Sequence, residues 1–510
     1  MAQPILETAY GKLRGSSAGG VHVFRGVRYG ADTGGANRFR PPQPPAPWSG
    51  ARDALTNGPA APQLAKPENT DPFFAWYSAI EPPSEDCLFL NVFTPALDNA
   101  RRPVMFWIHG GGWREYSGGA TGFDGSALAR EQDVVVVAIN HRLGVFGHLM
   151  LDGDSHPDAG NVGSLDVVAA LEWVRDHACA IGGDPDNVTV FGESGGASKT
   201  AALLSMPRAR PLFHKAILQS SAGGMRLAEP SEARRNADGL KTALGLDRLT
   251  AETMRELPMQ AVLEATRQVP SPFRGMIDGR TYIEHPYGDK AAAAAAGKPL
   301  LIGTTGTEAT YYMRGDPGNF ALDWSQVVAR LGRFFEIDKT AAARITDAYR
   351  AANPNASASF VLFLAASDFI FKRNGYRIAG LQAATGAPVF SYHFEWETPV
   401  ENGRMGSVHT LEVPFIFGTT DAARACVGSG QDIPAMSSKM MASWASFARK
   451  GDPNTAQLPR WAPYSQADPQ VMRLGNECCL AHDPGGTARS ALADLPYFGY
   501  AHNIAAITAD

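Results

Sequence analysis

The sequence predicts an α/β fold in which a mostly parallel sheet carries helices on both faces. Apolar runs at residues 102–110 and 133–140 are bounded by turn residues, a pattern typical of buried parallel strands. Residues 167–183 have the apolar periodicity of an amphipathic helix and end in glycines. Because strands and helices alternate from about residue 85 to residue 220, the connections favour a parallel sheet.

The stretch VFGESGGA at residues 190–197 follows a short apolar strand and precedes a helix-forming run. Ser194 lies between Gly192 and Gly195-Gly196 in the pattern G-x-S-x-G. A phosphate-binding loop needs a lysine in register after its glycines, and none follows here. A strand, a sharp turn and a helix form the context in which a nucleophilic serine is presented. The pattern is short, however, and a serine in a glycine-rich turn is more often structural.

Composition argues against several classes of partner. With 44% hydrophobic residues, 19% charged residues and a net charge of -5, the chain has no long-range attraction for nucleic acid or an anionic membrane. The five cysteines are few and odd in number, which favours a reducing compartment. The first residues lack the pattern of a secretory leader, and no apolar run reaches the roughly 18 residues of a membrane helix. We expect a soluble cytoplasmic protein without a membrane span or a nucleic-acid partner.

We expect a single domain over residues 1–510. Residues 225–298 and 310–375 are rich in helix-forming residues and interrupt the strand pattern, so we interpret them as helical insertions over the sheet.

A second stretch, WIHGGGW at residues 107–113, strengthens the interpretation of Ser194 as a nucleophile. Its three consecutive glycines follow a strand and expose backbone N–H groups to a developing oxyanion, although such a segment is also a flexible turn. A serine hydroxyl is a weak nucleophile near neutral pH. It needs a base to take its proton and an acid to orient that base.

A third stretch, EDCLFLNVFTP at residues 85–95, resembles the second signature of type B carboxylesterases, and FGESGGA resembles their nucleophile signature. That family has the α/β-hydrolase fold and includes para-nitrobenzyl esterases and cholinesterases. Further similar segments follow in family order over nearly the whole chain, among them GKLRG, RFRPPQPPAPWSG, INHRLGVFG, NVGSLDVVAALEWV, LLIGTTGTEA and HTLEVPFIFG. The resemblance implies an α/β-hydrolase fold and hydrolysis of carboxylic esters by a serine esterase.

On this resemblance the nucleophile falls on Ser194, the acid on Glu308 and the base on His409. The order Ser, Glu, His along the chain is the one expected of α/β-hydrolases. The family's oxyanion-hole donors fall on the N–H groups of Gly111, Gly112 and Gly195. The resemblance implies no cofactor and no metal, a small ester as substrate, and a monomer or homodimer.

Several residues near these positions leave alternatives open. Glu412 lies close to His409 in sequence and competes with Glu308 as the acid, but a triad acid in this fold comes from a separate strand end. The same His409 to Glu412 segment resembles a two-ligand metal fragment, yet no HExxH pair or cysteine cluster supplies further ligands. Glu193, next to the nucleophile, either tunes the site electrostatically or forms a buried hydrogen bond.

Other histidines and aromatic residues have less specific expectations. We assign His109 to holding the oxyanion loop, and His141 and His148 to packing. The aromatic stretches at residues 71–80 and 310–313 either line an apolar pocket over the serine or belong to the core of the insertions.

The resemblance also implies two buried ion pairs, Arg142 with Asp166 and Arg38 with Glu85. Two rival functions stay open. One is an amidase or carbamate hydrolase with the same triad, and the other is a non-catalytic binding protein, because the fold also serves adhesion proteins that have lost the nucleophile. Retention of all three triad residues argues against the binding protein.

Overall fold

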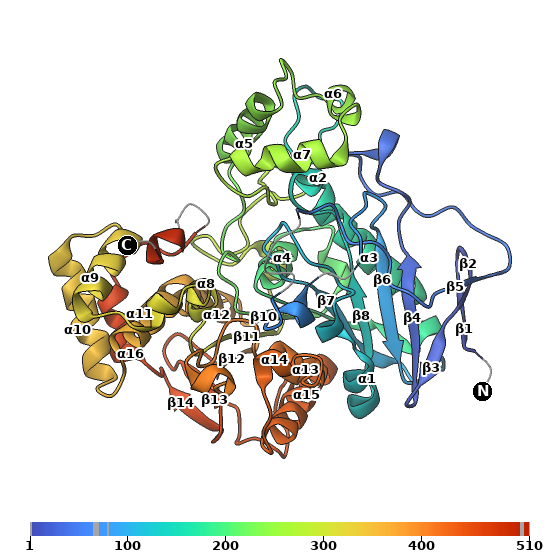
Figure 1. Cartoon of the computed structure of the whole chain (residues 1–510). Coiled ribbons are helices and arrows are strands. Elements are labelled where there is room, and N and C mark those ends of the chain that lie inside the picture. The colour runs from blue at the N-terminus through green and yellow to red at the C-terminus, as the bar shows by residue number, and fades with distance from the viewer. Residues whose placement is uncertain (1–2, 65–70, 79–80, 500–503, 509–510) are drawn as a thin grey trace.

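The computed structural model describes residues 3–64, 71–78, 81–499 and 504–508, and a large twisted sheet runs through its centre (Figure 1). In spatial order the strands of this sheet are β14 (Cys479–His482), β13 (Gln470–Leu474), β12 (Val389–Phe394), β11 (Leu300–Thr305), β10 (Lys215–Gln219), β9 (Gly183–Glu193), β7 (Arg102–Ile108), β8 (Val135–Ile139), β6 (Phe89–Thr94), β4 (Val21–Arg28) and β3 (Ser16–Ala18). The pairs from β8 to β13 are parallel, and the strands at both edges are antiparallel. The predicted mostly parallel sheet is therefore confirmed.

The central strands are buried on both sides, which explains their continuous apolar sequences. Every residue of β7 and of β8 is buried. Along β7, Val104, Phe106 and Ile108 belong to one apolar cluster, whereas Met105 and Trp107 belong to another. Because side chains alternate across a strand, the two clusters are the cores on opposite faces of the sheet.

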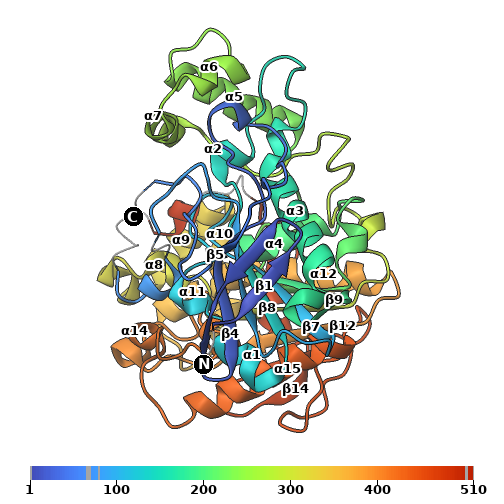
Figure 2. The same cartoon turned by 90° about the vertical axis from the view of Figure 1, so that its right-hand side faces the viewer.

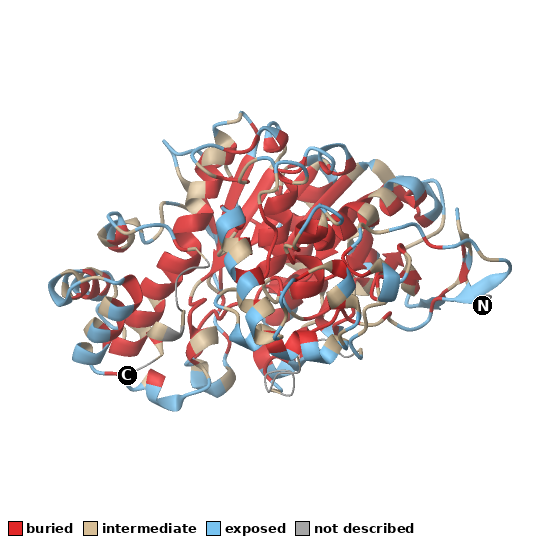
Figure 3. Ribbon diagram, turned by 90° about the horizontal axis from the view of Figure 1, so that it is seen from above, coloured by how far each residue is buried: buried red, intermediate tan, exposed pale blue. Residues whose placement is uncertain are grey.

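Helices cover both of these faces. The first face packs against α3 (Val162–His177), α4 (Gly195–Leu203) and α12 (Arg373–Ala383). The second face packs against α1 (Ser126–Gln132), α13 (Val413–Phe417) and α15 (Ile433–Lys450). Seen from above, buried residues fill the centre of the molecule, and the outer helices and loops carry the exposed ones (Figure 3). This layered arrangement is the α/β-hydrolase fold.

Further helices gather outside the sheet. The first group comprises α5 (Pro230–Ala243), α6 (Ala251–Arg255) and α7 (Met259–Ala265), which lie together at the top of Figures 1 and 2. The second group comprises α9 (Trp324–Phe335), α10 (Lys339–Ala352), α11 (Ala358–Ser367) and α16 (Gly486–Arg489), which share an apolar core of their own at the left of Figure 1. The description of residues 1–510 as one domain with two helical insertions stays a prediction.

Among the shorter elements are the small sheet β1 (Ile5–Thr8), β2 (Gly11–Arg14) and β5 (Ala51–Asp53), and the helices η3 (Ala75–Tyr77), α2 (Gly144–Gly147), α8 (Thr310–Met313), η11 (Asp368–Lys372) and α14 (Arg424–Val427). In the part of the chain that the structure describes, no helix combines the length and the apolar character that crossing a membrane requires.

Both predicted ion pairs form. Arg142, just after β8, donates from Nε to Asp166 on α3 at 2.8 Å and from a terminal nitrogen at 2.6 Å, and both side chains are buried. Arg38 donates from Nε to Glu85 at 2.7 Å, and because Glu85 is only partly buried this second pair is less buried than predicted. The first pair ties the segment after β8 to α3.

Candidate active site

Ser194 lies at a sharp turn between β9 and α4. Its backbone has φ 56° and ψ -121°, a conformation that is unusual for a residue with a side chain and stores strain. The flanking glycines are required because α4 approaches β7 closely. A Cβ on Gly192 would lie 2.6 Å from the carbonyl oxygen of Ile108, and one on Gly196 would lie 2.0 Å from the same atom.

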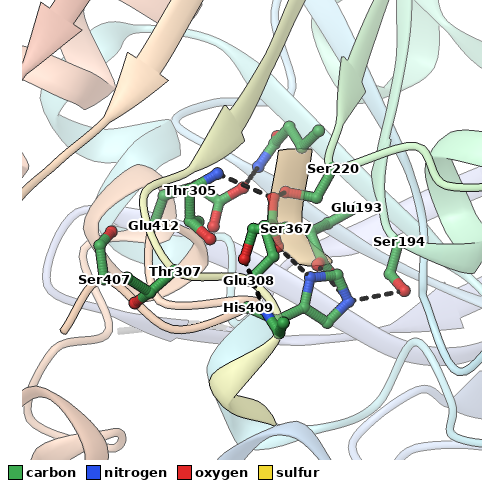
Figure 4. Close-up of polar contacts among 12 residues, drawn as sticks. Glu193, Ser194, Ser220, Thr305, Thr307, Glu308, Ser367, Ser407, His409 and Glu412 are labelled. Atoms are coloured by element: carbon green, nitrogen blue, oxygen red, sulfur yellow. Dashed lines mark hydrogen bonds and ion pairs between the residues drawn. The ribbon is translucent and has the colours of Figure 1, made fainter. Parts of the chain in front are cut away.

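The side chain of Ser194 faces His409, and the imidazole in turn faces Glu308 (Figure 4). His409 Nε2 lies 2.9 Å from Ser194 Oγ, and His409 Nδ1 lies 2.5 Å from Glu308 Oε2. The carboxylate only accepts, so Nδ1 donates to Glu308 and the Nε2 lone pair is left to accept from the serine hydroxyl. Glu308 and His409 are buried, and Ser194 is partly exposed.

These three residues come from distant parts of the chain. They meet at the carboxyl ends of the parallel strands. Ser194 follows β9, Glu308 follows β11, and His409 lies in the loop between β12 and α13. Strands β9, β10, β11 and β12 are successive parallel neighbours, so their carboxyl ends lie side by side. Active sites of α/β sheets occupy this edge.

The Glu308 carboxylate is held by groups that the sequence analysis missed. Ser220 donates from Oγ to Glu308 Oε1 at 2.6 Å, and the backbone N–H of Thr305 donates to the same oxygen at 2.8 Å. Ser220 directly follows β10, the strand between those that precede Ser194 and Glu308. The available signal was a polar residue directly after an apolar strand. Residues in that position lie at the carboxyl ends of the strands, where the site is.

Glu193 is the second carboxylate beside the imidazole. Its Oε1 lies 3.2 Å from His409 Nε2, and its Oε2 accepts a hydrogen bond of 2.6 Å from the hydroxyl of Tyr77. This geometry is compatible with both expectations for Glu193, electrostatic tuning of the site and a buried hydrogen bond. Burial raises the pKa of Glu193 to about 7. For His409, burial acts to lower the pKa, but the charges of Glu193 and Glu308 outweigh it and raise the pKa to about 9.

Glu412 is buried near the same site but has other hydrogen-bond partners. Gln219 and Tyr392 donate long hydrogen bonds of 3.4 and 3.5 Å to its Oε1. Burial raises its pKa to about 8, so this carboxyl is mostly protonated at neutral pH. The oxygen that hydrogen-bonds to the imidazole belongs to Glu308.

The three glycines expected to form the oxyanion hole lie around the turn. Gly111 and Gly112 have φ values of 79° and 64°, which favour glycine. A Cβ on Gly195 would lie 2.4 Å from the nitrogen of Gly112, so the two backbone segments are in direct contact. His109, which precedes this loop, donates from Nδ1 to the carbonyl oxygen of Gly110 at 3.1 Å.

Aromatic rings surround the imidazole of His409. The ring centres of Tyr311 and Tyr312 lie 5.6 and 6.5 Å from it, and Phe371 lies 4.9 Å away. Phe74 packs edge-on against Tyr311 at 4.9 Å. Both tyrosines are partly exposed, whereas the described aromatic residues of the 71–80 stretch are buried. Residues 79 and 80 lie outside the described residues.

The described residues contain no group of three or more histidine, cysteine or acidic side chains placed to hold a metal ion.

Comparison with known proteins places this chain in a family. The model of the carboxylesterase family matches residues 2–491. The chain belongs to the carboxylesterase family. It is 33% identical to the para-nitrobenzyl esterase of Bacillus subtilis over 503 residues, which cover 96% of this chain and 99% of the relative. It is 36% identical to the phenmedipham hydrolase of Pseudarthrobacter oxydans, with 94% and 96% covered.

Solved structures agree with this assignment. The carboxylesterase of Geobacillus stearothermophilus superimposes with a TM-score of 0.82 at 36% identity, covering 96% of this chain and 99% of that one. A thermophilic para-nitrobenzyl esterase superimposes with a TM-score of 0.81 at 33% identity. The protein is a carboxylic ester hydrolase with the α/β-hydrolase fold, and the resemblance seen in the sequence is confirmed.

Proposed function

We propose that this esterase hydrolyses small carboxylic esters through a triad of Ser194, His409 and Glu308 and an acyl-enzyme intermediate. One observation carries the proposal: His409 lies within hydrogen-bonding distance of Ser194 Oγ through Nε2 and of Glu308 Oε2 through Nδ1. A nucleophile, a base and a group that orients the base are thus connected in the order that serine hydrolysis requires.

In the acylation step, His409 Nε2 takes the proton of Ser194 as Oγ attacks the ester carbonyl. The negative charge that develops on the carbonyl oxygen is stabilised by the backbone N–H groups of Gly111, Gly112 and Gly195. His409 then gives the proton to the departing alcohol. Glu308 accepts from Nδ1 throughout, which keeps the imidazole in the tautomer that leaves Nε2 free and stabilises its positive charge.

In the deacylation step, water takes the place of the alcohol. His409 removes a proton from the water as it attacks the acyl carbonyl, and the same glycine N–H groups stabilise the second oxyanion. Breakdown of this intermediate returns the proton to Ser194 and releases the carboxylic acid. Each step uses only groups of this chain, together with ester and water.

The substrate is proposed to present an apolar group to Tyr311, Tyr312 and Phe371, whose rings surround the imidazole. A carbamate is a second candidate substrate, because a relative at 36% identity is a phenmedipham hydrolase. Carbamate and ester share a carbonyl with an alcohol or phenol leaving group, so the same serine chemistry applies to both. We further propose that the esterase acts in the cytoplasm as a monomer or homodimer, which sedimentation and fractionation test.

The test of the proposed function uses Ser194→Ala. Removing Oγ is expected to abolish turnover of para-nitrophenyl esters and covalent labelling by an organophosphate, since both need the same activated hydroxyl. Intact-mass spectrometry measures the labelling and steady-state kinetics the turnover. Label on another serine together with surviving activity would show that Ser194 is not the nucleophile.

Initial rates on an ester, on an anilide with the same acyl group and on a carbamate with the same leaving group as the ester then rank the substrate classes. We expect the ester to be fastest. Preference for the carbamate or the anilide would favour the rival hydrolase, and inactivity of a folded protein on all three would favour a binding protein.

A further inference from the structure

A cavity of about 490 Å³ lies between α12 and the chain segment that contains α16 and η13 (Ser490–Leu492). None of the residues that line it belongs to the proposed triad or oxyanion hole. Its volume is in the range of sites that hold small organic molecules. The lining consists of Arg373, Tyr376, Arg377, Gly380, Leu381, Tyr464, Gln466, Asp483, Gly486, Arg489, Ser490, Ala493 and Tyr497.

The charges that line this cavity do not balance. Three arginines, Arg373, Arg377 and Arg489, are accompanied by a single carboxylate, that of Asp483. Arg489 forms an ion pair with Asp483, so these two charges neutralise each other. The hydrogen bonds described for Arg373 and Arg377 all go to backbone carbonyl oxygens. The lining therefore carries an excess of two positive charges.

An adjacent cavity of about 380 Å³ provides a contrast, because it shares Arg377 and Tyr497 with the first. In the adjacent cavity arginines and carboxylates are equal in number, and they are Arg226, Arg274, Arg377, Glu229, Glu232 and Asp289. Outside both cavities, Asp368 on η11 forms an ion pair of 2.8 Å with Lys372. The excess of positive charge is thus a property of the cavity beside α12.

Backbone carbonyl oxygens hold the two unpaired guanidinium groups in place. Arg373, of which only 8% is exposed, donates to the carbonyl oxygens of Leu495 at 2.9 Å and Pro496 at 3.3 Å. Arg377 donates to the carbonyl oxygen of Gly288 at 3.0 Å. A guanidinium has five N–H donors, so these bonds leave others for a ligand. Because both side chains are already fixed, binding an anion costs them little further freedom.

Tyrosine rings supply most of the apolar surface of the cavity. The rings of Tyr376 and Tyr464 stack at a centroid distance of 6.1 Å. The guanidinium carbons of Arg373 and Arg377 lie 5.0 and 4.9 Å from the ring centre of Tyr497. The hydroxyl of Tyr376 is buried and has no hydrogen-bond partner among the described residues, so a ligand oxygen is an acceptor that suits it. Positive charge and apolar surface therefore lie side by side in one cavity.

We propose that this cavity is a second binding site, which takes an organic anion with a carboxylate or phosphate group and an apolar body. Guanidinium groups bind carboxylate and phosphate through paired N–H···O bonds, whereas a neutral or cationic ligand would leave the excess charge uncompensated. The tyrosine rings and the volume suit an apolar body, which an inorganic ion lacks. The carboxylic acid that an esterase releases belongs to this class of ligand.

Isothermal titration calorimetry on the full-length protein tests the class of ligand. The probes are 2-naphthoate, 2-naphthyl phosphate, the neutral 2-naphthamide and inorganic phosphate. At least one of the two naphthyl anions is expected to bind, and the tighter one identifies the anionic group. The amide and inorganic phosphate are expected to bind at least roughly tenfold more weakly. Equal affinity for the amide or for inorganic phosphate, or no binding of either naphthyl anion, would overturn the proposal.

Arg377→Gln tests where the anion binds, because it removes one of the two excess charges. We expect the affinity for the naphthyl anion to fall by roughly ten- to a hundredfold, as for the loss of hydrogen bonds to a charged group. Arg175→Gln is the matched control, since it removes the same charge from an exposed pair with Asp176 on α3. Its affinity is expected to stay within about twofold of the wild type because solvent screens an exposed charge.

Thermal melting shows whether each variant is folded. Unchanged anion affinity in folded Arg377→Gln would overturn the proposal, and so would an equal loss of affinity in Arg175→Gln. If Arg377→Gln does not fold, Gln466→Glu decides, because it places a carboxylate on an exposed residue of the same lining. Weaker anion binding in that variant would support the proposal, and unchanged binding would overturn it. None of these measurements uses ester turnover, so failure of the proposed triad would leave their outcome unaffected.

Discussion

At the scale of single residues, the identity of the carboxylate beside each imidazole nitrogen decides the chemistry. Nδ1 of His409 faces Glu308, and Nε2 faces both the serine and Glu193. Glu412 is buried nearby but hydrogen-bonds to Gln219 and Tyr392. Three carboxyl groups thus lie around one site with different partners, and each is expected to respond differently to removal of its charge.

Replacement of Glu308 tests its proposed role as the acid of the triad. Glu308→Gln keeps the shape of the side chain but favours the wrong imidazole tautomer, so kcat is expected to fall roughly 10^3- to 10^4-fold. Glu412→Gln is the matched control. Because the pKa of Glu412 is raised to about 8, the amide resembles its protonated form, and kcat is expected to change by no more than a few fold. Steady-state kinetics on one ester compare the two, and a large loss confined to Glu412→Gln would reverse the acid assignment.

Replacement of Glu193 tests the pKa of the base. The charge of Glu193 is the main factor that raises the pKa of His409 against the effect of burial. The base must be neutral to accept a proton, so Glu193→Gln is expected to lower this pKa and to move the acid limb of the kcat/KM profile to lower pH.

Tyr77→Phe provides a second test of the same effect. Tyr77 donates a hydrogen bond to Glu193, and its loss favours the protonated carboxyl. The acid limb is expected to move in the same direction by a smaller amount. If the acid limb of the kcat/KM profile lies at the wild-type pH in both variants, Glu193 does not set the pKa of His409.

At the scale of elements, the turn from β9 into α4 depends on how closely the helix approaches β7. The space for a methyl group on Gly196 is already filled by the carbonyl oxygen of Ile108. Ser194 keeps its strained backbone only while this contact holds α4 in place. The glycines of G-x-S-x-G are therefore a packing requirement between two elements as well as a local turn signal.

Gly196→Ala tests this requirement. The added Cβ has no room, so we expect either loss of soluble protein or a folded protein with little activity. Gly315→Ala is the control, because a Cβ there meets nothing within 4 Å. Thermal melting and esterase assays measure both variants. A Gly196→Ala protein with normal melting temperature and normal kcat would disprove the close approach.

At the scale of the whole molecule, the Arg142 and Asp166 pair connects the sheet to α3 in the interior. Removing one partner leaves a buried charge without compensation, so Asp166→Ala is expected to lower the free energy of unfolding by roughly 3 to 5 kcal/mol. Asp176→Ala, on the exposed side of the same helix in a pair with Arg175, is expected to cost about 1 kcal/mol or less. Urea unfolding compares the two, and equal midpoints would contradict the importance of the buried pair.

Much of this architecture was predictable from local sequence patterns. The continuous apolar runs of β7 and β8 indicate strands that are buried on both sides. This was predictable because the periodicity and composition of a strand are properties of a short segment. The G-x-S-x-G turn is likewise recognisable because backbone strain and glycine requirements act over a few residues. The family resemblance extended the prediction of the site to Glu308 and His409, which no local pattern links to Ser194.

The tertiary structure decided which side chains meet. Phe371 contacts the site from a segment whose sequence carries no sign of it. Ser220 and Tyr77 lie in segments with only a general signal, a polar residue after an apolar strand and an aromatic stretch, which does not say what either side chain contacts. Glu308 rather than Glu412 faces the imidazole because β11 and β12 are neighbours in the sheet, although their chain segments are far apart. Local patterns determine strands, turns and helices because their causes are local. Contacts between residues at the carboxyl ends of different strands, and the pKa values that burial produces there, depend on how distant segments pack. No short stretch of sequence contains that information.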